Sequence, residues 1–103
     1  MGAGVPVIST PFGGVDTFVT SDAAFPIDCR LVELDGDYIP YPKGFVWADP
    51  DRNSLATQLS LVHADRGKTK LRADTARRRV FEYFCSPALV SKYGVELSRI
   101  ANL

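Results

Sequence analysis

The chain has 103 residues, 46% of them hydrophobic, and its 12 basic side chains balance its 12 acidic ones. This length suits one small domain with a modest core, and the apolar share excludes a disordered chain. Zero formal net charge gives no reason to expect a nucleic-acid partner. The sequence shows no export signal and no apolar run long enough to cross a bilayer, so we expect a cytoplasmic protein.

The first half of the chain predicts two strand regions joined by a glycine turn. Residues 5–10 are a β-branched run that enters through Pro6, as in a buried strand of a parallel sheet. Residues 11–14 predict a turn, and residues 15–19 have room for one or two helical turns. Residues 24–34 predict the second strand region, because apolar and polar side chains alternate there.

An aromatic loop over residues 38–47 precedes three expected helices. Asp49-Pro50 combines a capping carboxylate with proline and predicts the start of the first helix. Gly67 is expected to end it, the second helix to run from about residue 68 to 84, and Ser86-Pro87 to begin the third. The expected inward stripes are Leu55-Leu59-Val62, Leu71-Ala76-Val80-Phe84 and Leu89-Tyr93-Leu97-Ile100. This order is typical of the trailing half of an α/β domain.

The opening segment Gly2-Ala3-Gly4-Val5-Pro6-Val7-Ile8-Ser9-Thr10-Pro11-Phe12-Gly13-Gly14 resembles the interior of a larger enzyme. Group 1 glycosyltransferases, which have the two-domain GT-B architecture, carry a segment of this form late in their second domain. A second segment, Tyr38 to Asp51 with Trp47-Ala48-Asp49-Pro50-Asp51 at its end, resembles an insertion found in one subset of the same family. The similarity runs through the final helix and so covers the whole chain.

The resemblance implies a fold and a reaction. The fold would be α/β: a partial Rossmann-like parallel sheet followed by about three helices. Residues 1–103 would then form a single fragment of the donor-binding, C-terminal domain. The parent enzyme would transfer a sugar, with retention, from a nucleotide diphosphate sugar to a hydroxyl acceptor. It would need no metal and no cofactor.

The resemblance also implies that most of the site is missing from this chain. Two glutamates, eight positions apart, contact the donor in the family, and the second would fall two residues before Met1. The donor-proximal positions that remain are Thr10, Gly13 and Gly14. We therefore expect no catalysis from these residues alone. A free-standing binding or interaction module that kept the scaffold and lost the chemistry is the alternative.

Several features have two interpretations. The Gly13-Gly14 pair suits a plain tight turn or a close approach to phosphate. The aromatic loop residues can stack on a ligand ring or cover the sheet, and covering is the commoner use. His63, the one histidine, has no predicted carboxylate partner and is expected at the surface.

The remaining features are a basic helix, two cysteines and the edges of a partial sheet. The basic helix around Arg77-Arg78-Arg79 suits peripheral contact with an anionic membrane, or a solvated face with ion pairs to Asp65, Asp74 and Glu82. Cys29 and Cys85 match no metal-ligand spacing and are expected as reduced thiols. Because a partial sheet has unpaired edges, the chain is expected to self-associate.

Overall fold

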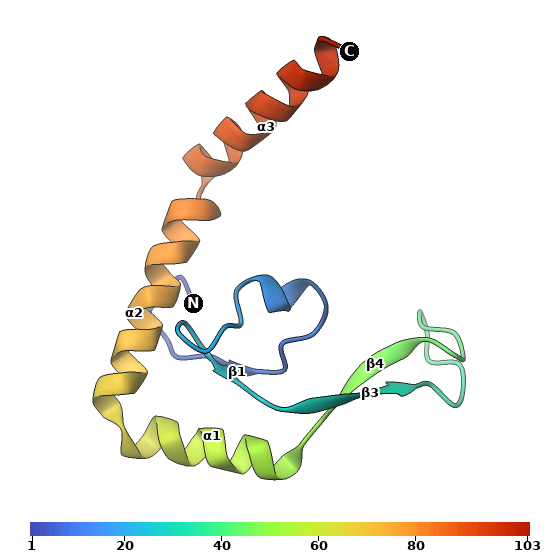
Figure 1. Ribbon diagram of the computed structural model, residues 1–103, viewed down its shortest axis with the longest axis vertical. Helices are drawn as coiled ribbons and strands as arrows, with labels where there is room; N and C mark the ends of the chain where they lie inside the picture. The colour runs from blue at the N-terminus through green and yellow to red at the C-terminus, as the bar shows by residue number, and fades with distance from the viewer.

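The computed structural model describes all residues from Met1 to Leu103 and is a mixed α/β structure with two small sheets and three α-helices (Figure 1). In chain order the elements are β1 (Ile8–Ser9), the 3-10 helix η1 (Gly13–Thr17), β2 (Phe25–Pro26), β3 (Cys29–Glu33), β4 (Val46–Pro50), α1 (Arg52–Ala64), α2 (Arg66–Tyr83) and α3 (Ser86–Ala101). No helix combines the length and apolar character that a membrane crossing requires.

The first sheet is a parallel pair, as the sequence predicted, but it is short. Ile8 in β1 lies opposite Phe25 in β2. The Phe25 N–H donates to the Val7 carbonyl at 2.9 Å, and the Ile27 N–H donates to the Ser9 carbonyl at 2.9 Å. Pro26 has no N–H to donate, which suits the edge position it occupies. With two strands of two residues each, the sheet is not a full Rossmann-like fold.

The predicted second strand region divides between the two sheets. Residues 25–26 pair with β1, whereas residues 29–33 turn away and pair antiparallel with β4. Phe25 and Ile27 are buried as predicted, but Leu31 is 61% exposed because no layer covers the β3–β4 hairpin. Residues 46–50 form a strand where the sequence indicated the end of a loop and a helix start.

The three predicted helices are present; the first two begin at residues other than those expected, whereas the third begins at Ser86, as expected. Asp49 does not cap α1: it lies in β4, and Asp51 is the cap, accepting a hydrogen bond from the Asn53 N–H at 2.9 Å. Gly67 does not separate the first two helices, because it lies in the first turn of α2, which Asp65 caps. Ser86 is the first residue of α3 rather than its cap.

The core lies where α2 crosses the N-terminal segment. Eight residues are buried: Val19, Ala23, Ala24, Phe25, Ile27, Leu34, Ala73 and Ala76. Phe25 is fully covered, and the Arg72 guanidinium sits 4.4 Å from the centre of its ring while donating to the Ala24 carbonyl at 2.9 Å. Of the predicted α2 stripe, Ala76 is buried, but Leu71 is 67% exposed because it points away from this seam.

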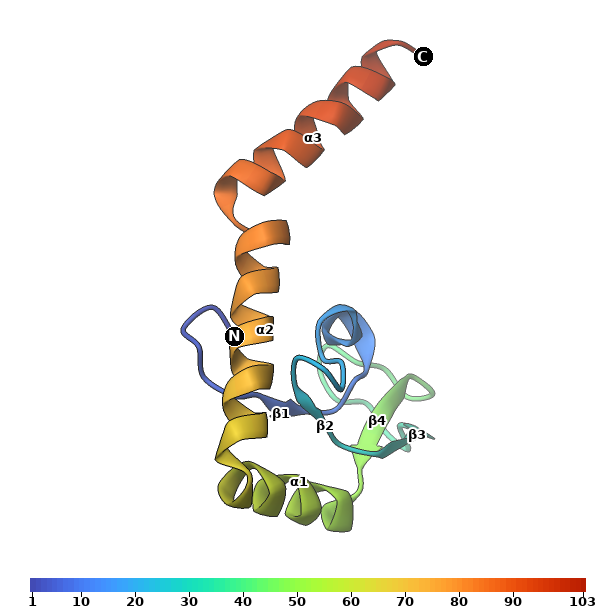
Figure 2. The same ribbon diagram turned by 60° about the vertical axis from the view of Figure 1, so that its left-hand side comes forward.

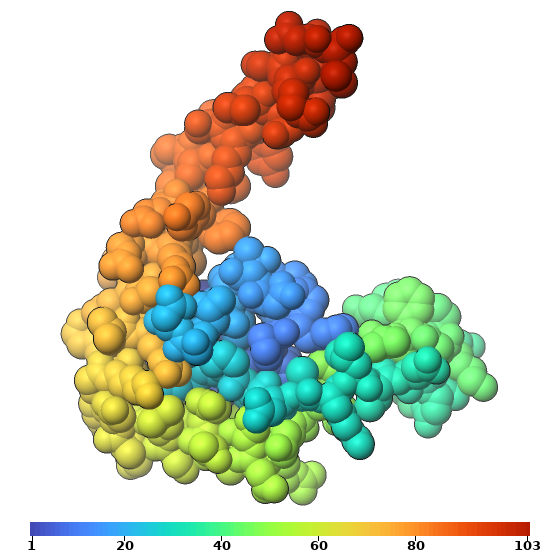
Figure 3. All heavy atoms as spheres, viewed as in Figure 1, coloured from blue at the N-terminus to red at the C-terminus, as the bar shows by residue number.

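The molecule is open rather than compact. Its principal extents are 51 × 43 × 18 Å, and its radius of gyration is 17.7 Å, against about 13 Å for a compact chain of this length. Figures 1 and 2 show α1 and α2 as a bent frame beside the N-terminal segment, with α3 running away from it. In Figure 3 the β3–β4 hairpin and α3 both project from the central mass.

Candidate functional site

The predicted donor-proximal residues follow the carboxyl end of β1. Thr10 is half-buried, and its carbonyl accepts the Phe12 N–H at 3.0 Å, which turns the chain outward. Gly13 then begins η1 with φ +72°, a left-handed conformation that favours glycine. Both Gly13 and Gly14 are exposed, and open space surrounds the position a side chain would take. The turn is therefore free for the close approach of a ligand.

An apolar cavity joins this turn to the aromatic loop. Its volume is about 190 Å³, and its six lining residues are Phe12, Leu34, Tyr41, Phe45, Val46 and Trp47. Phe12 comes from the turn after β1, whereas the aromatic rings of the loop come from the far end of the hairpin. Leu34, at 4% exposed, is the one buried residue of this lining, whereas the loop was predicted to cover the sheet, and the sheet residues Leu31 and Val46 stay exposed. The structure thus places the turn after β1 and the aromatic loop at one cavity.

The loop that lines this cavity is held by its own contacts. The Leu34 N–H donates to the Phe45 carbonyl at 2.8 Å, and the Gly44 N–H returns to the Leu34 carbonyl at 3.0 Å. Tyr38 and Trp47 rings lie 5.7 Å apart, and the Tyr38 hydroxyl donates to Asp35 at 3.2 Å. Tyr38 and Trp47 remain 49% and 41% exposed. The rings therefore present a half-open apolar surface that can receive a planar group.

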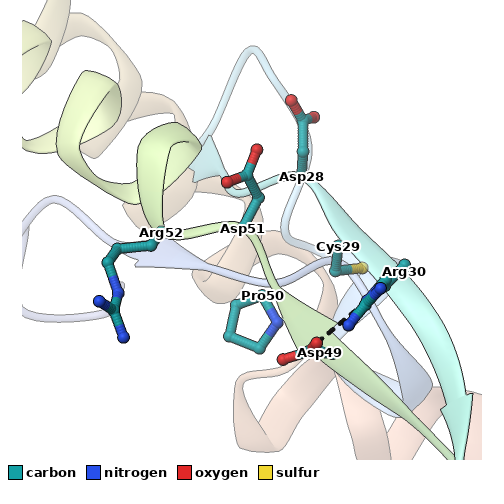
Figure 4. Close-up of a pocket in the computed structure, with 7 residues that line it drawn as sticks. All are labelled: Asp28, Cys29, Arg30, Asp49, Pro50, Asp51 and Arg52. Carbon is teal, nitrogen blue, oxygen red and sulfur yellow. Dashed lines mark hydrogen bonds and ion pairs between the residues drawn. The ribbon is translucent and has the colours of Figure 1, made fainter.

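A polar hollow of about 440 Å³ lies where the hairpin meets α1 (Figure 4). Its residues are Asp28, Cys29, Arg30, Asp49, Pro50, Asp51 and Arg52. The Arg30 guanidinium pairs with Asp49 at 3.1 Å, and Asp51 is occupied in capping α1. Figure 4 shows the side chains of Asp28 and Arg52 pointing away from this pair. The hollow lies at the connection between the hairpin and α1, and no three of its side chains converge as a metal site.

A partly exposed ion pair links α2 to the segment before β2. Arg79 makes a bidentate contact with the Asp22 carboxylate, and Nη1 also lies 3.0 Å from the Thr20 hydroxyl. Thr20 in turn donates to Asp22 at 2.7 Å. The Arg79 guanidinium and then the Thr20 hydroxyl hold the pKa of Asp22 well below its usual range, and the same contact raises the pKa of Arg79. Besides making this pair, Arg79 also lines a hollow of about 350 Å³ together with Thr17, Phe18, Tyr83, Phe84 and Lys92.

Ion pairs account for much of the charge on the basic helix. Lys70 pairs with Asp74 at 2.7 Å and Arg78 with Glu82 at 3.9 Å, as predicted. Asp65 forms no ion pair, because its carboxylate caps α2. Arg79 is turned inward to the pair described above. Of the three ion-pair partners predicted for this helix, Asp74 and Glu82 are therefore paired and Asp65 is not.

The remaining candidates are His63 and the two cysteines, which lie apart from the aromatic cavity. His63 is exposed, as predicted. Cys29 and Cys85 form no disulfide and are half-buried. None of these side chains lines the aromatic cavity, so none supplies it with a nucleophile or a base.

Sequence reasoning selected Gly13 and Gly14 but did not select their neighbour Phe12. A ring next to an exposed glycine turn, in a chain with a second aromatic cluster, was the available signal.

Comparisons of the chain with protein-family models, curated proteins and solved structures found no match. The case for a function therefore depends on the residues and their geometry.

Proposed function

We propose that this chain is part of the donor-binding domain of a group 1 glycosyltransferase, in which it forms the trailing part of a Rossmann-like sheet and the helices after it. The parent reaction is transfer of a sugar from a nucleotide diphosphate sugar to a hydroxyl acceptor, in the cytoplasm. The proposal rests on the resemblance of residues 1–14 and 38–51 to that family. These 103 residues alone hold no catalytic set.

The observation that best supports this proposal is the position of the glycine turn. Gly13 and Gly14 follow the carboxyl end of β1, which is paired in parallel with β2. In open α/β sheets, ligands bind at the carboxyl ends of the strands. The turn is exposed and uncrowded, and Phe12 beside it contributes a ring to the aromatic cavity. A nucleotide diphosphate sugar offers phosphates for such a turn and flat rings for such a cavity.

A free-standing binding module is the second candidate. The observation in its favour is that all six residues of the aromatic cavity belong to this chain, so the cavity needs no other domain to form. A module of this kind would bind an apolar or aromatic group and would have no use for a nucleotide diphosphate. The two candidates therefore differ in which ligand the aromatic surface receives.

We expect the purified chain to transfer no sugar from common nucleotide-sugar donors, because groups that stabilise the transition state must be held in place and most are absent. Glycosylated acceptor above a heat-killed control would contradict this expectation. Donor binding can be measured separately by the fluorescence of Trp47, which is the only tryptophan and lines the cavity.

The same chain, extended at its N-terminus by residues from its own gene that include the glutamate pair, is the matched comparison. We expect UDP-glucose, GDP-mannose or a related donor to change Trp47 fluorescence in the extended chain at much lower concentration than in the 103-residue chain. Equal responses, or none with any donor, would count against the glycosyltransferase proposal.

A further inference from the structure

One side of α3 is an uncovered apolar stripe. Leu89, Val90, Tyr93, Leu97 and Ile100 recur at helical spacing and fall on one side of the helix. Four of them are 55–71% exposed, and Leu89 is half-buried. We call these five residues the α3 stripe. The opposite side carries Ser91 and Ser98, with one exposed apolar residue, Val95, beside them, so most of the apolar surface of the helix lies in the α3 stripe.

The contacts at the start of α3 direct it away from the body of the protein. Lys92 donates to the Tyr83 carbonyl at 3.0 Å, and its ammonium lies 5.3 Å from the Tyr83 ring and 5.6 Å from the Phe84 ring. Figures 1 and 2 both show α3 continuing outward from the end of α2 with no other segment beside it. The chain therefore cannot cover the α3 stripe in this conformation.

The chain exposes more surface to water than a compact monomer of its mass does. The accessible surface is 7539 Å², whereas a compact monomer of this mass exposes about 5,700 Å². The excess of about 1,800 Å² is more than the roughly 800 Å² that each partner contributes to a stable interface of standard size. A second copy that covers about 800 Å² of each chain would therefore remove nearly half of this excess from water.

Charge does not oppose the approach of a second copy. The formal net charge is zero, so two copies lack the overall repulsion that keeps strongly charged proteins apart. Along α3, Arg99 is paired with Glu96 at 2.9 Å, and Lys92 is held against α2. The flanks of the α3 stripe thus carry no free block of like charge.

We propose that the α3 stripe is covered by the α3 stripe of a second copy, with the two helices antiparallel about a twofold axis. A twofold contact needs only one self-complementary surface, and a single apolar stripe satisfies that requirement. The contact buries the most exposed helix of the chain and leaves the Gly13 turn and the aromatic cavity free. It does not depend on the glycosyltransferase proposal.

The test is the solution mass by sedimentation equilibrium at micromolar concentration. We expect about twice the 11.3 kDa chain mass for the wild type. Leu97→Asp places a charge in the α3 stripe and should weaken association by about tenfold or more. Ser91→Asp, on the opposite side of the same helix, is the control and should leave the mass of the wild type. Far-UV circular dichroism checks that both variants keep their helices.

A monomeric wild type overturns the proposal. So does an assembly whose mass is the same in Leu97→Asp and in Ser91→Asp, because association would then use another surface. Neither result bears on the glycosyltransferase proposal, which is tested by donor binding and by the gene sequence.

Discussion

Two aspartates two positions apart have different roles, and the one that the sequence indicated as a helix cap, Asp49, is not the cap. Asp49 pairs across the sheet with Arg30 at 3.1 Å, with both side chains largely in water. Asp51 accepts the Asn53 N–H and satisfies one of the free donors at the start of α1. Pro50 separates them and ends β4 opposite Cys29. The carboxylate after the proline, not the one before it, is the cap.

We expect Asp51→Ala to lower the free energy of unfolding by about 1 kcal/mol, the usual cost of losing a helix cap. Asp49→Ala should change it by less than about 0.5 kcal/mol, because an exposed ion pair contributes little. Urea denaturation of both variants at one protein concentration measures the difference. A larger loss in Asp49→Ala would show that α1 begins earlier than described here.

The Asp22–Arg79 pair makes stability depend on acid. Because the folded protein lowers the pKa of Asp22, the ionised carboxylate stabilises the fold above its unfolded pKa, near 3.9. That contribution is lost as the pH falls through the lower, folded value. We expect Asp22→Asn to be less stable than wild type at neutral pH and the difference to shrink below about pH 4. Denaturation midpoints across this range measure it; a gap that does not change with pH would contradict the pairing.

At the candidate site, the sequence identified the turn but not its surroundings. Glycine pairs report local backbone geometry, so the positions of Gly13 and Gly14 could be predicted from neighbouring residues alone. Phe12 lines the same cavity as Phe45 and Trp47, which requires the turn after β1 to pack beside the β3–β4 hairpin. That long-range pairing has no local signal, which is why the cavity could not be predicted.

Among the elements, α2 shows how packing selects a helix face. Ala73 and Ala76 are buried against the N-terminal segment, where Ala23 and Ala24 are also buried. Small side chains on both sides allow the backbones to approach closely. The sequence pattern instead favoured Leu71, because large apolar residues are the usual core residues, and this residue faces water. Periodicity located the helix but did not identify which side would meet a neighbour.

The packing of α2 against the N-terminal segment predicts a clear loss of stability for one substitution in this helix and almost none for another. Ala76→Leu inserts extra volume at a position only 2% exposed, and we expect a loss of about 1–3 kcal/mol. Leu71→Gln, at an exposed position, should change the free energy of unfolding by less than about 0.5 kcal/mol. Chemical denaturation followed by circular dichroism compares them. Tolerance of leucine at position 76 together with a loss at position 71 would place the seam on the other side of α2.

The strands were harder to predict than the helices. Three helices were expected and three are present, because caps and helical spacing are local signals. The strand over residues 46–50 was missed, since Asp49-Pro50 has the form of a helix start. Residues 29–33 were expected to continue the first sheet, yet they pair with that missed strand. A strand is defined by its partner, and the sequence of one segment does not specify it.

At the scale of the whole molecule, the chain buries few residues for its length. Only 8 of 103 residues are buried, and both the hairpin and α3 extend beyond the core. A chain with so small a core gains little from hydrophobic burial within itself. Both proposals address this openness: neighbouring elements of a larger enzyme would cover the sheet, and a second copy would cover the α3 stripe.

The DNA immediately upstream of the Met1 codon tests the central claim most directly. The glycosyltransferase proposal predicts an open reading frame with a glutamate two codons before Met1 and a second glutamate eight positions earlier. An in-frame stop codon there, with a ribosome-binding site for Met1 itself, would contradict the proposal and favour the free-standing module.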